Sequence, residues 1–188
     1  MKFVTVMGSP REDGNTANVL AWMEEELRTQ GHDVDHIDIM DCRVAYCDGC
    51  FRCQNTDDGP GCIQDDDANV IFKRMIEADG VVFASPLYCW GFAAPMKALL
   101  DRGVCLIKRP SSENAVYLLA GKRAGLVVTA GGPEEGNADL IVETFRRYTE
   151  YLRCAPKGHL VVPYCVQNVE LGSNVRVQAR DLAHDLVE

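Results

Sequence analysis

The sequence predicts one α/β domain over residues 1–188, built on a doubly wound parallel sheet of five strands with a cysteine-rich insert at 41–64. Short apolar runs alternate with segments whose apolar residues recur every three or four positions, which is the order expected when strands and helices alternate. Three of the runs are almost continuously apolar, as strands buried on both faces of a parallel sheet are. A chain of 188 residues can bury a substantial core without disulfide bonds.

The first strand is predicted to end at residue 7, because Gly8, Ser9 and Pro10 follow its apolar run and begin a turn. The third and fourth strands contain no charged residue, which favours central positions in the sheet. The predicted strands span residues 2–7, 33–39, 80–85, 124–129 and 159–165.

Helical periodicity fills the segments between these strands. The first helix is expected to end before Gly31, and the second to begin after the acidic residues 65–67, since negative charge is favourable at a helix N-terminus. A third helix has Pro95 in its first turn, and the last has Ser173 as its N-cap. The apolar faces of the five helices lie within 17–27, 68–76, 95–100, 141–152 and 175–186.

The turn after the first strand distinguishes between two strand orders. It lacks the Gly-x-Gly-x-x-Gly sequence of Rossmann dinucleotide sites and the Gly-Lys-Ser/Thr of nucleoside triphosphate loops. We therefore expect the other doubly wound arrangement, with the flavodoxin-like strand order 2-1-3-4-5.

The same turn carries polar side chains around the start of a helix, namely Ser9, Arg11, Asn15 and Thr16. Hydroxyl groups and free backbone N–H groups at the positive end of a helix dipole suit one terminal phosphate group. The alternative is that Ser9 and Asn15 only cap the helix.

Two further loops, 86–92 and 129–133, follow the third and fourth strands and should meet the first turn at the same sheet edge. The first is aromatic and could border a planar ring system, whereas glycines in the second would let backbone N–H groups approach a ring carbonyl. Aromatic core packing and a plain turn are the respective alternatives. The candidate residues of the two loops are Pro86, Leu87, Tyr88, Trp90, Gly91, Thr129, Gly131 and Gly132.

Four cysteines, Cys47, Cys50, Cys53 and Cys62, lie within the connection 41–64, which is too long for an ordinary loop in a compact domain. Three interpretations of the cysteines remain open: a [4Fe–4S] cluster, plain thiols, or tetrahedral zinc, for which two separated pairs of ligands are the usual pattern. Among the other cysteines, Cys89 stands beside the proposed ring site.

Composition limits the class of partner and the compartment. A net charge of −9 repels a phosphate backbone, so we expect no nucleic-acid partner. We expect no membrane span, because no apolar stretch approaches the roughly 20 residues that one needs. The apolar run at 3–7 is too short for an export signal, which predicts a reducing cytoplasm with free or metal-bound thiols.

The segments GSPREDGNT, SPLYCWGFAAPMKALLDR and TAGG make the chain resemble the NAD(P)H-dependent FMN reductase family of flavodoxin-like proteins. The cysteine insert resembles that of its iron–sulfur flavoprotein branch, although eight residues separate Cys53 from Cys62 where the branch has a shorter gap.

The resemblance implies an FMN enzyme that oxidises NAD(P)H, reduces a small-molecule acceptor and assembles as a homodimer or homotetramer. It also implies that Ser9, Arg11, Asn15 and Thr16 hold the FMN phosphate, that loop 86–92 borders the ribityl chain and the ring, and that loop 129–133 faces the pyrimidine edge. The alternative is an electron carrier whose cluster exchanges electrons with FMN and with ferredoxin-like partners.

Overall fold

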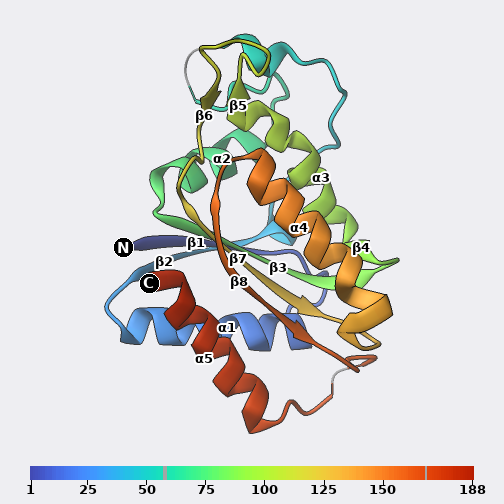
Figure 1. Ribbon diagram of the computed structural model, residues 1–188. Helices are drawn as coiled ribbons and strands as arrows, with labels where there is room; N and C mark the ends of the chain where they lie inside the picture. The colour runs from blue at the N-terminus through green and yellow to red at the C-terminus, as the bar shows by residue number, and fades with distance from the viewer. Residues whose placement is uncertain (57–58, 168) are drawn as a thin grey trace.

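The computed structural model describes residues 1–56, 59–167 and 169–188 and contains a central parallel sheet (Figure 1). Its principal strands are β1 (Lys2–Met7), β2 (Asp33–Asp38), β3 (Gly80–Tyr88), β7 (Arg123–Thr129) and β8 (Ala155–Val162). They lie in the order β2-β1-β3-β7-β8 and pair in parallel. The predicted α/β class and the predicted order 2-1-3-4-5 are therefore confirmed.

Two strands differ from the predicted bounds by more than one residue. β8 begins at Ala155 and ends at Val162, before Pro163, which has no N–H group to continue the ladder. β3 continues to Tyr88 because its last residues pair antiparallel with a short strand, β4 (Gly91–Phe92).

Helices cover both faces of the sheet (Figure 1). Phe3 and Met7 of β1 belong to the apolar layer beneath one pair of helices, whereas Val4 and Val6 belong to the opposite layer, as alternation along a strand requires. The first pair comprises α1 (Asn15–Thr29) and α5 (Ser173–Val187), and the other face carries α2 (Ala68–Glu77), α3 (Ala94–Arg102) and α4 (Asp139–Tyr151).

The predicted N-cap of the last helix was wrong. Gly172 is the N-cap of α5, and Ser173 is its first helical residue, with no side-chain capping bond at this end. None of the helices in the described parts of the chain is both long and apolar enough to cross a membrane.

The long connection after β2 lies at one end of the molecule beside a small hairpin, β5 (Ile107–Lys108) and β6 (Val116–Tyr117) (Figure 1). Short 3₁₀ turns at Ile39–Asp41 and Arg52–Asn55 interrupt the connection. Because α3 leads from the β4 end of the sheet to this region, it links two distant parts of the molecule.

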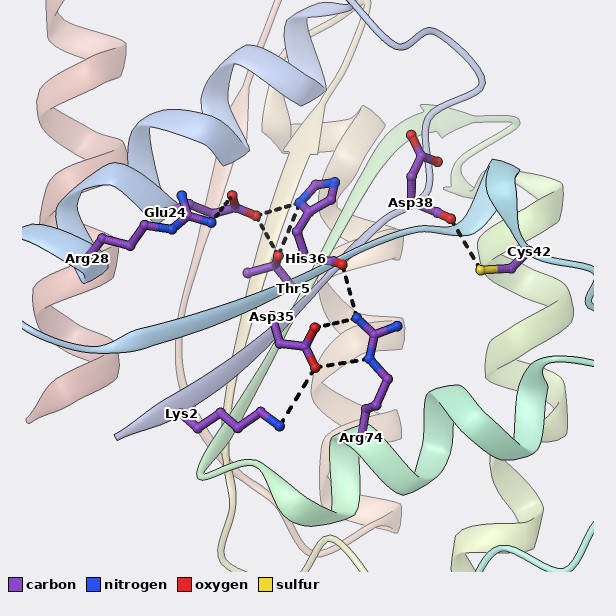
Figure 2. Close-up of polar contacts among 9 residues, drawn as sticks. All are labelled: Lys2, Thr5, Glu24, Arg28, Asp35, His36, Asp38, Cys42 and Arg74. Atoms are coloured by element: carbon purple, nitrogen blue, oxygen red, sulfur yellow. Dashed lines mark hydrogen bonds and ion pairs between the residues drawn. The ribbon is translucent and has the colours of Figure 1, made fainter.

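A polar cluster joins α1 to the first two strands (Figure 2). Glu24 of α1 is 7% exposed in its side chain and accepts from Thr5 Oγ1 at 2.5 Å, and its Oε1 lies 2.7 Å from His36 Nδ1. Separately, Arg74 of α2 pairs with Asp35 of β2 and donates to the carbonyl oxygen of His36. These bonds fasten β2, an edge strand, to helices on both faces.

Candidate functional site

A first cavity of about 80 Å³ lies where β1, β3, β7 and β8 end. The three loops predicted to meet at the carboxyl edge of the sheet therefore do so, and the segment after β8 joins them. Nine of the twelve predicted cofactor residues line it, namely Ser9, Arg11, Asn15, Thr16, Pro86, Leu87, Tyr88, Thr129 and Gly131.

The N-terminus of α1 opens into this cavity without a side-chain cap. Gly14 is the N-cap residue, and the first turn of α1 contains no acidic residue. Ser9 Oγ instead accepts a hydrogen bond from the backbone N–H of Arg11 at 3.1 Å. The structure thus disagrees with the alternative that Ser9 and Asn15 only cap the helix, and it leaves a positive helix end toward the cavity.

Thr16 and Thr129 bring two of the loops into direct contact. Their hydroxyl oxygens are 2.6 Å apart, and both residues are buried. The Thr129 side chain therefore lies beside a residue expected to hold the phosphate. Asn15 Nδ2 donates to the carbonyl oxygen of Val169 at 3.2 Å, which fixes the loop after β8 against the same helix start.

The other three predicted residues, Trp90, Gly91 and Gly132, do not line this cavity. Cys89 and Trp90 form the two-residue turn between β3 and β4, with φ of 47° and 62°. Positive φ at both central residues is the requirement of a type I′ hairpin turn, in which glycine or asparagine is usual. Trp90 is 59% exposed, so its ring lies on the surface next to the cavity loops.

Sequence analysis missed three lining residues after β8, namely Cys165, Val166 and Gln167, together with Gly14. The signal was available, since the loop after a fifth parallel strand should meet the same sheet edge. The predicted strand 159–165 includes residues 163–165, so it leaves Cys165 outside the predicted loop.

Gly8 allows α3 to pack against the first loop. A Cβ at this position would lie 2.8 Å from Met96 Cβ and 3.1 Å from the carbonyl oxygen of Ala84. Its N–H donates to that carbonyl at 2.7 Å, so the loop leaves β1 in close contact with both β3 and α3.

A second cavity, of about 240 Å³, gathers all four predicted metal ligands, Cys47, Cys50, Cys53 and Cys62. Other parts of its lining come from the C-terminal end of α3, including Asp101 and Arg102. No three His, Cys, Asp or Glu side chains within residues 1–56, 59–167 and 169–188 converge closely enough to surround a single metal ion. The structure thus places the four cysteines around one space, and the cluster, zinc and plain-thiol interpretations all remain predictions.

Burial affects the acidity of two cysteines at this end of the molecule. It raises the pKa of the Cys53 thiol, and the neighbouring Cys62 raises it further. Burial likewise raises the pKa of Cys105 to about 12. Cys53 is therefore neutral at pH 7 by itself and would lose its proton only when it binds a metal.

Lys108 of β5 forms hydrogen bonds with the connection that carries the four cysteines. Its side chain is buried, and Nζ donates to the carbonyl oxygens of Cys53 and Pro60, both at 2.8 Å, and to Thr56 Oγ1 at 2.9 Å. Asn69 of α2 forms two further hydrogen bonds with the backbone of Cys62. Its Oδ1 accepts from the N–H of Cys62, and its Nδ2 donates to the carbonyl oxygen of Cys62. These contacts fix the backbone positions of Cys53 and Cys62.

Comparison with known proteins places the sequence among flavin proteins. The sequence model of one protein family, described as NADPH-dependent FMN reductase, matches residues 1–153. A protein named iron-sulfur flavoprotein from Archaeoglobus fulgidus is 34% identical over 138 residues, which cover 72% of this chain and 58% of that protein. Another protein of that name, from Methanosarcina thermophila, is 31% identical over 144 residues, which cover 77% of this chain and 70% of that protein. The match thus spans less than two thirds of the Archaeoglobus relative.

The fold is similar to that of solved structures over its whole length. The NAD(P)H:quinone oxidoreductase from Methanothermobacter marburgensis matches with a TM-score of 0.75 and 19% identity, covering 100% of this chain and 96% of that one. At this level of identity the likeness establishes the doubly wound fold alone.

Proposed function

Because the chain belongs to the NADPH-dependent FMN reductase family, we propose that it binds FMN, oxidises NAD(P)H and reduces a small-molecule acceptor such as a quinone or free flavin. The observation that carries the proposal is the first cavity, where an uncapped helix N-terminus meets hydroxyl groups from two loops. A single phosphate monoester fits that set of donors.

The phosphate end of FMN belongs inside the first cavity. Ser9, Thr16 and Thr129 offer hydroxyl groups there, and Arg11 offers a positive charge. The cavity measures about 80 Å³, which is below the roughly 300–1,000 Å³ of a pocket that encloses a whole small molecule. The flavin ring would therefore extend outward along Pro86, Leu87 and Tyr88 toward the exposed Trp90.

When bound, FMN supplies the hydride and electron chemistry, for which no acid–base side chain is needed. The residues of this chain bind and orient it. In the proposal the backbone N–H groups of Gly131 and Gly132 face the pyrimidine edge, where they stabilise negative charge that develops on reduction. The exposed surface around Tyr88 and Trp90 leaves room for a nicotinamide and then an acceptor in the same place.

Flavin content and turnover test this proposal. Protein purified from cells should be yellow, should release FMN and not FAD on denaturation, and should oxidise NADH or NADPH with a quinone as acceptor. Parallel double-reciprocal plots are expected, because one open ring face would serve both substrates in turn. Absence of flavin, or equal affinity for FAD, would contradict the proposed monophosphate site.

A second candidate function is favoured by the second cavity. Four cysteines around one space suit a [4Fe–4S] cluster, with the thiolates of Cys47, Cys50, Cys53 and Cys62 as ligands. In that case the chain would act in the cytoplasm as an iron–sulfur flavoprotein, which exchanges single electrons with a ferredoxin-like partner. The thiolate ligands would give the cluster its position and charge.

Iron analysis distinguishes the two functions. Anaerobically purified protein should contain about four iron atoms and four acid-labile sulfides per chain. Cys50→Ser should abolish both while FMN content stays unchanged, and Cys89→Ser, at an exposed cysteine outside the cavity, should alter neither. Wild-type protein without iron and sulfide would leave the simple FMN reductase.

A further inference from the structure

Arg102, at the end of α3, is a buried cation in the lining of the cysteine cavity. Its side chain is only 1% exposed. Nη1 donates to Ala45 O at 3.0 Å and to Gln64 Oε1 and Asp66 Oδ2, each at 2.7 Å. Nη2 donates to Asp66 Oδ1 at 2.9 Å, so the two terminal nitrogens are engaged by protein oxygens.

The remaining nitrogen, Nε, is buried and has no hydrogen-bond partner among the residues that the structure describes. A buried N–H group without an acceptor is costly and rare, and it calls for a specific explanation. Arg102 and Cys62 both line the cysteine cavity. Burial alone would lower the pKa of Arg102, but hydrogen bonds with the side chains of Asp66 and Cys62 raise it. The missing acceptor therefore belongs on the cavity side, next to the Cys62 sulfur.

We propose that Arg102 donates its Nε–H to the sulfur of the anionic group bound in the cysteine cavity and stabilises the reduced form of that group. This inference rests on the proposed iron–sulfur function. Reduction adds one electron and hence one negative charge, while no bond forms or breaks. A fixed guanidinium with an aligned donor favours that added charge.

Other charged groups at the cavity reduce the effect without removing it. Asp66 pairs with Arg102 and offsets much of its charge. Asp48 and Asp101 also line the cavity, and Asp101 is paired with Lys97 at 2.7 Å. A hydrogen bond acts at short range on one acceptor, so its effect remains when the net charge of the surroundings is small.

The test compares Asp66→Asn with the double variant Arg102→Gln/Asp66→Asn. The two variants share the loss of the Asp66 charge and differ only at Arg102, and the double variant leaves no buried carboxylate without its partner. Anaerobic titration with dithionite should place the cluster potential of Asp66→Asn above that of wild type. The double variant should fall below Asp66→Asn by about tenfold in the reduction equilibrium, which is about 59 mV for one electron.

Iron, sulfide and FMN are measured in each sample. Equal potentials in the two variants would overturn the role of Arg102 and leave the iron–sulfur function standing. Wild-type protein without iron and sulfide would overturn both. If the double variant keeps FMN but loses iron, Arg102→Lys decides: it keeps the charge without an Nε–H and should hold a cluster of lower potential than wild type. A wild-type potential in Arg102→Lys would exclude the hydrogen bond.

Discussion

The contact between Thr16 and Thr129 makes one residue of the first cavity directly testable. Thr16→Val removes a hydroxyl group while nearly preserving shape. A hydrogen bond to a charged group contributes about 1.5–3 kcal/mol, so the dissociation constant for FMN should rise roughly tenfold or more. Riboflavin, which lacks the phosphate, should lose much less.

Fluorescence titration with both ligands measures this difference. Thr149→Val is the matched control, because Thr149 is a buried threonine whose hydroxyl donates to carbonyl oxygens of its own helix α4. That control should leave both affinities unchanged. Equal losses for FMN and riboflavin in Thr16→Val would move the phosphate to another part of the site.

Substitutions in the turn at Cys89 and Trp90 distinguish the effect of backbone strain on stability from the effect of an aromatic ring on FMN binding. Both residues adopt left-handed backbone conformations, which glycine adopts without penalty. Each of Cys89→Gly and Trp90→Gly should therefore raise stability by about 1 kcal/mol, visible as an increase in Tm of the protein without flavin. Only Trp90→Gly should also weaken FMN, because only it removes an aromatic ring. Normal FMN affinity in Trp90→Gly would exclude contact between this ring and the flavin.

At the scale of elements, the Glu24–His36 pair that joins α1 to β2 should make stability depend on pH. The hydrogen bond to Glu24 raises the pKa of His36 above its usual 6.5, despite partial burial. Burial alone would raise the pKa of Glu24, but hydrogen bonds from His36 and Thr5 lower it below 4.5.

The sign follows from linkage. The contribution of His36 is complete below pH 6.5 and is lost as pH rises through its raised pKa; that of Glu24 is lost as pH falls through its lowered pKa. His36 is 43% exposed, so solvent screening limits the alkaline loss to about 1 kcal/mol. Urea unfolding between pH 6 and 9 should show this loss in wild type, and His36→Gln should flatten it. An unchanged slope in the variant would assign the titration to another group.

The hairpin that carries Lys108 should control metal binding at a distance from the flavin. Lys108→Met leaves the carbonyl oxygens of Cys53 and Pro60 without their donor, which costs about 1–3 kcal/mol for each buried group. The variant should lose iron and part of its thermal stability while it keeps FMN.

A matched control is Lys122→Met, because Lys122 Nζ also donates to a backbone carbonyl, that of Ala78, and does not touch the cysteine cavity. It should retain iron. If Lys108→Met kept a full complement of iron, the hydrogen bonds from Lys108 would not be needed to position Cys53.

The principal elements could be predicted from the sequence because their signals are local. The uncharged runs at 80–85 and 124–129 and the apolar faces of the helices indicate burial directly. The strands β4, β5 and β6 could not be predicted, since each has only two residues and owes its pairing to tertiary contacts. The bounds of β8 could not be predicted for the same reason, since they depend on its pairing with β7 and on the proline that follows it.

The first cavity followed from a topological rule applied to loops, so nine of its lining residues could be named. For the cysteine cavity, the sequence predicts the four cysteines but none of the other residues that line it. Arg102 and Lys108 have no local signal, because a basic residue near the end of a helix or in a short strand is usually exposed. Only the folded chain shows that both are buried beside the cysteines.

At the scale of the whole molecule, the small size of the first cavity predicts an assembly. One chain leaves Tyr88, Trp90 and Tyr164 exposed beside the cavity loops, with 45%, 59% and 64% of their surfaces accessible. A second subunit would cover a flavin ring that this chain leaves open. Light scattering should give a dimer or tetramer at micromolar concentration. A fully active monomer would exclude a shared site.

The helix α3 has a consequence for the distance between the two cavities. Its first turn packs on Gly8, at the start of the loop after β1, and its last residue lines the cysteine cavity. Nine helical residues extend about 14 Å, and a packed helix neither stretches nor shortens. If FMN and a cluster are both bound, this helix would keep the phosphate end of the flavin at a constant distance from the cluster, whatever the motion of the surrounding loops.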